Sequence, residues 1–140
     1  MSEILASVPV DGHYVVTLLD AYTAHARICQ PNENFAVLMP DQLKAALARP
    51  YSGYFTELYE KAAALMESLA GSQVFATANK RTAIALVDLL IRESGCRLCP
   101  YGPERIGVAN EELSKAVGER TMKLDELKEW YRLRIRRFVA

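Results

Sequence analysis

Apolar residues recur at three- and four-residue steps along most of this sequence, the spacing of one face of an α-helix. The first such set comprises Val15, Leu18, Leu19, Tyr22 and Ala26. Asp11 precedes this set as a candidate N-cap, so we expect a first helix that buries these side chains on one face. The next stretch, residues 30–34, has the composition of a turn.

Two further helices are predicted before residue 72. Pro40 and Asp41 open a short helix that carries Leu43, Ala46 and Leu47 and ends before Pro50. A loop rich in aromatic residues follows at 50–57, where a partner chain could dock. The apolar positions of the next helix are Leu58, Ala62, Leu65, Met66 and Leu69. This helix starts near Glu57 and stops near Gly71.

Residues 79–94 carry apolar side chains on nearly all sides, which is typical of a helix at the centre of a domain. Gly95 ends this helix, and two more helices are predicted over residues 111–117 and 123–138. The chain is therefore expected to be all-α, a compact helical bundle around the buried central helix. Its 140 residues fit a single domain over 1–140.

Composition and charge narrow the classes of function. The chain is 51% apolar and balances 17 basic with 17 acidic side chains, so no global field favours nonspecific nucleic-acid or membrane binding. Its longest apolar stretch, residues 83–91, is interrupted by Asp88 and is too short to cross a bilayer. The first residues lack the pattern of a secretion signal, so we expect a cytoplasmic protein.

Cys96 and Cys99 form a Cys-x-x-Cys pair. A structural zinc site would need two more ligands from Cys29, His13 or His25, all distant in sequence, so reduced packing thiols are favoured. Arg132, Arg136 and Arg137 cluster near the end of the last predicted helix, whereas Arg134 lies on its apolar stripe. They suit the C-terminal end of a helix dipole, and a docking patch for an acidic partner is the alternative.

The segment of residues 73–83 runs from a loop straight into the central helix, with Lys80 and Arg81 at the helix start. A helix N-terminus presents free backbone N–H groups, so two adjacent cations there can form a cradle for phosphate groups. The alternative is that both cations are simply solvated.

This segment, Gln-Val-Phe-Ala-Thr-Ala-Asn-Lys-Arg-Thr-Ala, resembles the Fic/Doc signature His-x-Phe-x-(Asp/Glu)-(Gly/Ala)-Asn-(Gly/Lys)-Arg. Members of its death-on-curing (Doc) branch continue Asn-Lys-Arg-Thr-Ala, as residues 79–83 do. Residues 43–50 and 57–70 also resemble Doc segments, and 106–134 resembles the Doc tail. The resemblance spans residues 39–134.

The resemblance implies a site that moves a phosphoryl group or AMP from ATP or another nucleotide onto a protein hydroxyl. Lys80 and Arg81 would hold phosphates, Asn79 would orient them, and Phe75 would anchor the loop in the core. The implied role is that of a Doc-like toxin with a Phd-like antitoxin as partner, and elongation factor Tu is the target of Doc itself.

Two motif positions depart from the family pattern. Gln73 stands where the family has the histidine that removes the proton from the attacking hydroxyl, and an amide cannot act as that base. Thr77 stands at the acidic position that would hold Mg²⁺, which prefers a carboxylate. His13 or His25 could replace the base, but histidines on such helices are usually packing or surface residues. Glu67 is expected to be a solvated carboxylate.

Two functions follow from these departures. The first is a toxin-like transferase that keeps some activity through another base or metal arrangement. The second is a pseudoenzyme, a non-catalytic module that keeps the fold and the phosphate cradle and acts by binding a protein.

Overall fold

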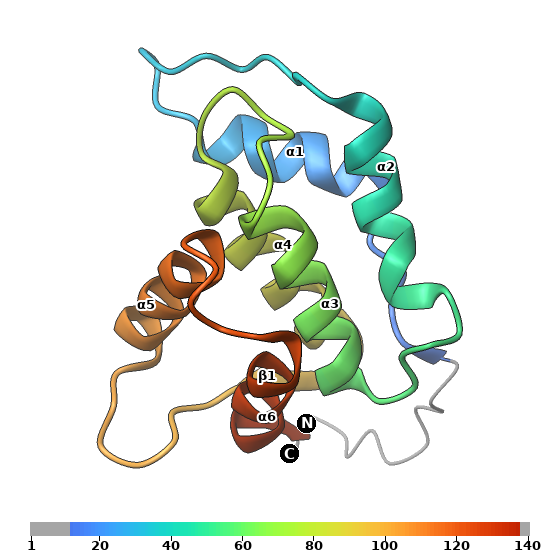
Figure 1. Ribbon diagram of the computed structural model, residues 1–140, viewed down its shortest axis with the longest axis vertical. Coiled ribbons are helices and arrows are strands. Elements are labelled where there is room, and N and C mark those ends of the chain that lie inside the picture. Colours follow the sequence, from blue (N-terminus) through green and yellow to red (C-terminus); the bar gives the residue numbers. More distant parts are fainter. Residues whose placement is uncertain (1–11, 138–140) are drawn as a thin grey trace, which may run out of the picture.

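A computed structural model describes residues 12–137 of the chain. Its α-helices within this range are α1 (Leu18–Ile28), α2 (Pro40–Ala48), α3 (Leu58–Ala70), α4 (Asn79–Glu93), α5 (Ile106–Gly118) and α6 (Leu124–Arg134). Helices α3 and α4 lie in the middle, α1 crosses one end of the molecule, and α2 and α5 flank opposite sides (Figure 1). The predicted all-α fold is confirmed, and α5 begins five residues earlier than the sequence pattern indicated.

Within the described residues the helices are accompanied by one short two-stranded sheet. Strand β1 (Cys96–Leu98) pairs antiparallel with β2 (Ile135–Arg137), and Cys99 N–H donates to the Arg134 carbonyl at 2.8 Å. The prediction of one helix over residues 123–138 was therefore wrong at its end. Helix α6 stops at Arg134 because the chain then becomes extended, with φ −79° and ψ 127° at Ile135, to hydrogen-bond with β1.

The predicted buried face of the first helix was also wrong. Val15 precedes α1, and Leu19 and Tyr22 on it are 73% and 39% exposed. The helix starts at Leu18, after a capping box made by Thr17 and Asp20, later than the cap predicted at Asp11 implied. The predicted cap, Asp11, lies outside the described residues, and the buried face consists of Ala21 and His25.

The hydrophobic core forms where α3 packs against α4 and α6. Residues 61–66 of α3 are all buried, and Ala62, Ala63 and Ala64 let neighbouring helices approach closely. Helix α4 buries one broad face, so α3 is enclosed more completely than the helix that the sequence pattern placed at the centre.

Glu67 of α3 is not a solvated carboxylate. Its Oε1 accepts from Arg49 Nη1 at 2.8 Å, and both side chains are 34% exposed. Arg49 also donates to Ser68 Oγ at 2.9 Å, so it ties η2 (Arg49–Tyr51), the 3₁₀ turn after α2, to α3.

Two further features concern membranes and thiols. Within residues 12–137 no helix is both long and apolar enough to cross a membrane. Cys29, Cys96 and Cys99 are free thiols, and no cluster of three metal-ligating side chains occurs in the described part of the chain.

Candidate functional site

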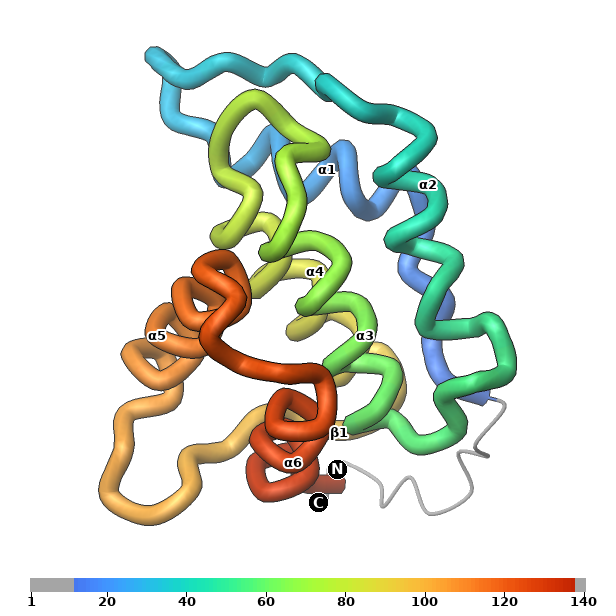
Figure 2. The backbone as a smooth tube through the Cα atoms, viewed as in Figure 1, coloured from blue at the N-terminus to red at the C-terminus, as the bar shows by residue number. Residues whose placement is uncertain are grey.

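The loop between α3 and α4, residues 71–78, is held by a second, extended segment. Leu38 N–H donates to the Val74 carbonyl at 2.8 Å, and Ala76 N–H donates to the Ala36 carbonyl at 3.0 Å. The two segments run antiparallel over this short stretch, with Val37 opposite Phe75. Figure 2 shows how the chain between α1 and α2 passes over this loop. The loop is therefore a fixed platform in front of α4.

The entry into α4 is made by a left-handed residue. Ala78 has φ 64° and ψ 26°, and its carbonyl accepts from Thr82 N–H at 3.0 Å. A non-glycine residue in this region costs roughly 1–2 kcal/mol. The sharp turn aims the first N–H groups of α4, which have no acceptor within the helix, back toward the loop.

The side-chain amide of Asn79 clasps this turn. Its Oδ1 accepts from Phe75 N–H and its Nδ2 donates to the Phe75 carbonyl, both at 2.9 Å. The Nδ2 group also lies 3.5 Å from Gln73 Oε1. Asn79 thus holds the loop, and the role that the family resemblance implied for it, orienting phosphates, stays a prediction.

A cavity of about 370 Å³ opens at this turn. Five of the predicted site residues line it together, namely Gln73, Thr77, Asn79, Lys80 and Arg81. The remaining wall comes from the end of α3, from other residues of the loop at 71–78, and from Gly118 at the end of α5. The sixth predicted residue, Phe75, does not line the cavity and is fully buried beneath the loop.

The two motif cations have different surroundings. Arg81 Nη2 donates to Glu33 Oε2 at 2.6 Å, which lowers the pKa of that carboxyl and raises the pKa of the guanidinium. Lys80 has no carboxylate partner among the described residues, and its side chain passes over Gly118. The cavity therefore has one cation committed to an ion pair and one available for an anion.

The Fic/DOC family model matches residues 12–91, more than half of the chain. The chain belongs to the Fic/DOC family. Comparisons with curated proteins and with solved structures found no match. The family match starts earlier than the expected resemblance, at Gly12 rather than Met39, and it ends inside α4 at Ile91. The likeness of residues 106–134 to a Doc tail stays a prediction.

The Fic/DOC cavity does not fit a magnesium ion held by protein ligands. No lining residue carries a carboxylate, and Lys80 and Arg81 bring positive charge. Thr77, at the acidic motif position, donates its hydroxyl to the Asn34 carbonyl at 3.2 Å. Mg²⁺ in proteins is usually bound through one or two carboxylates together with substrate phosphates, so the protein part of such a site is missing here.

His25 of α1 was suggested by the sequence only as an alternative base or zinc ligand, and its contact with the Fic/DOC loop was not predicted. It is 3% exposed, its ring stacks on Phe75, and its Nε2 lies 3.0 Å from the Thr77 carbonyl oxygen. Because a carbonyl only accepts, Nε2 carries the proton. The stacking of His25 on Phe75 could not be predicted, because no spacing in the sequence links the two residues. His13, the other histidine, borders a different cavity, beside Glu57 and Arg132.

Proposed function

We propose that the chain is a Doc-type member of the Fic/DOC family whose cavity binds the polyphosphate of ATP or another nucleotide, with phosphoryl or AMP transfer lost or severely reduced. The observation that supports nucleotide binding is the shared cavity. Gln73, Lys80 and Arg81 line one hollow at the start of α4, where backbone N–H groups and positive side chains suit phosphate oxygens.

The proposed loss of transfer rests on the missing base. Gln73 is exposed at the cavity, but an amide does not take a proton at neutral pH. Loss of general-base catalysis typically costs about 10²–10⁴-fold in rate. His25 does not substitute for it, because its ring is buried under the loop and its Nε2 is bonded to Thr77.

A pseudoenzyme is the second candidate, and the pairing of Arg81 with Glu33 favours it. A motif cation held in an internal ion pair is less available to a phosphate that is being transferred, so the arrangement suits a binding role better than a catalytic one. For both candidates the expected partner is a Phd-like antitoxin, and the expected target is a translation factor such as elongation factor Tu. The expected location is the cytoplasm. The motif at residues 79–83 supports this assignment.

Two measurements test the proposal. Calorimetric titration with ATP, with and without magnesium, should show binding by the native chain and weaker binding by Lys80→Ala. Incubation with radiolabelled ATP and elongation factor Tu should label the target far more with Gln73→His than with the native chain. Native labelling equal to that of Gln73→His would overturn the loss of transfer, and no ATP binding by the native chain would overturn the phosphate site.

A further inference from the structure

The turn between α5 and α6 directly follows Gly118, which lines the cavity, and contains an unusual residue. Helix α5 ends in a Schellman motif, in which Arg120 N–H donates to the Val117 carbonyl at 3.1 Å and Thr121 N–H donates to the Ala116 carbonyl at 2.9 Å. The left-handed position of this motif usually holds glycine. Here it holds Arg120, with φ 60°.

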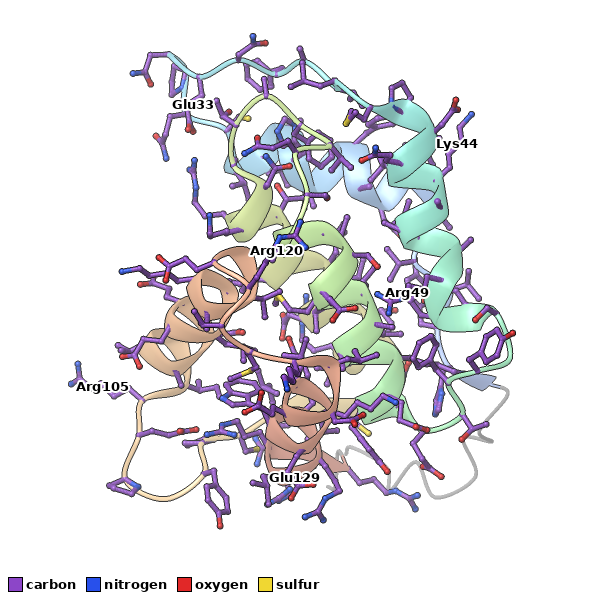
Figure 3. All side chains as sticks on the ribbon, viewed as in Figure 1. Glu33, Lys44, Arg49, Arg105, Arg120 and Glu129 are labelled. Carbon is purple, nitrogen blue, oxygen red and sulfur yellow. The ribbon has the colours of Figure 1, made fainter. Side chains whose placement is uncertain are left out.

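The Arg120 side chain is directed at the motif loop. Its Nη2 lies 3.4 Å from the carbonyl oxygen of Gly71, a residue that lines the cavity. Figure 3 shows Arg120 at the end of α5 next to this loop, with Arg105 at the opposite end of the helix. Arg120 is exposed and has no carboxylate partner among residues 12–137. Most of the N–H donors of its guanidinium group are therefore available to a ligand.

Gly118, two residues earlier, controls the position of Lys80. A Cβ at residue 118 would lie 2.6 Å from Lys80 Cε, 3.2 Å from its Nζ and 3.3 Å from the Ala70 carbonyl oxygen. An alanine would displace the lysine side chain, since its flexible end yields more easily than the backbone. The absence of a side chain at residue 118 thus allows the ammonium group to lie over the end of α5.

We propose that this turn completes the phosphate site, with Arg120 as a further phosphate-binding cation and Gly118 as the residue that positions Lys80. The proposal rests on the nucleotide-binding function above and adds to it. Because Arg81 is paired with Glu33, the cations available to a polyphosphate are Lys80, which lines the cavity, and Arg120, which lies at its edge. The Nη2 of Arg120 is 3.4 Å from the carbonyl oxygen of Gly71, a lining residue. The ligand class is a nucleoside polyphosphate or another compound with adjacent phosphate groups.

Arg120→Gly provides the sharpest test, because glycine relieves the left-handed backbone and should leave the melting temperature unchanged or raised. ATP and inorganic tripolyphosphate are titrated calorimetrically into the native chain and the variant. Removing a charged hydrogen-bond donor should weaken both affinities about tenfold or more. Arg105→Gly is the matched control, since it removes the same charge at the N-cap of α5, a position that tolerates glycine.

A second pair of variants tests Gly118. Gly118→Ala should weaken tripolyphosphate binding by displacing Lys80, whereas Gly107→Ala, in the same helix with open space around its Cβ, should bind as the native chain does. Unchanged affinity in Gly118→Ala would overturn the positioning role.

The outcomes separate this inference from the proposed function. Native-like affinity in Arg120→Gly, together with weakened binding in Lys80→Ala, overturns the role of Arg120 and leaves the proposed function standing. Equal weakening in Arg105→Gly and Arg120→Gly also overturns it, because net charge alone then explains the effect. Native-like affinity in Lys80→Ala overturns the proposed phosphate site, and the role of the turn with it.

Discussion

The imidazole of His25 stacks flat on the ring of Phe75, with ring centroids 3.8 Å apart and planes 9° apart. The same imidazole donates to the Thr77 carbonyl, and the Cys29 sulfur lies 3.3 Å from its Nε2. One side chain of α1 therefore supports the motif loop from below through both packing and hydrogen bonding. The loop is thus supported by a residue that precedes Phe75 by 50 positions and Thr77 by 52.

Replacing His25 should loosen the loop. His25→Ala leaves a cavity under Phe75 and should lower the free energy of unfolding by about 2–4 kcal/mol. His25→Phe keeps an aromatic ring but leaves the Thr77 carbonyl without its donor, at a cost of about 1–3 kcal/mol. Urea unfolding measures both values, and hydrogen exchange of residues 74–78 should accelerate in each variant. Arg27→Ala, on the exposed side of α1, is the control, and equal exchange in all three would contradict this role.

Ala78→Gly should stabilise the chain. Ala78 pays for a left-handed backbone at the start of α4, and glycine adopts that conformation without the steric cost. Glycine also gains freedom in the unfolded state, so the net increase in the free energy of unfolding should be about 0.5–1 kcal/mol. Ala76→Gly, at a residue with negative φ in the same loop, should instead destabilise. Urea denaturation of the pair checks the sign, and a lower stability in Ala78→Gly would show that the turn is unstrained.

The helices were predictable where local signals mark their ends. Pro40 begins α2, and Gly95, with φ 85°, follows α4 as the sequence indicated. Lys80 and Arg81 were recognisable as two cations at a helix start because that placement is encoded within a few neighbouring residues. Helix α1 was misjudged because several apolar side chains near it, including Leu19, are exposed, so apolar spacing alone did not identify the buried face.

Long-range partners could not be read from the sequence. The pairing of Glu33 with Arg81 joins residues 48 positions apart, and β2 forms only because β1 lies beside the end of α6. The apolar spacing therefore predicted helix beyond Ile135, whereas pairing with the neighbouring strand makes the backbone extended there. Gly118 was noticed only as part of a family-like stretch, since its contact with Lys80 exists only in three dimensions.

Glu104 should make stability depend on acid pH. Arg134 donates to both carboxylate oxygens, at 2.6 and 2.7 Å, and this pairing lowers the pKa of Glu104 to about 2. A lowered pKa contributes stability above the ordinary pKa of Glu, and that contribution is lost as the pH falls toward 2. At pH 6, Glu104→Gln should therefore cost about 1–2 kcal/mol, discounted for partial exposure. The difference between the urea midpoints of the native chain and of Glu104→Gln should be smaller at pH 3 than at pH 6. An equal difference at the two pH values would exclude this pair as the cause.

Glu33→Gln should release Arg81 toward the cavity. The carboxylate now holds the guanidinium at 2.6 Å, and Figure 3 shows Glu33 on the segment that passes over the motif loop. Because the pKa of Glu33 is lowered, mild acid does not break the pair, and a substitution is needed. Arg81 is 46% exposed, so the pair is weak, and ATP affinity should rise about two- to fivefold. Glu112→Gln makes the same charge change on the exposed side of α5. A rise of equal size in that control would assign the effect to net charge, and no rise in either would mean that Arg81 does not reach the phosphates even when it is free.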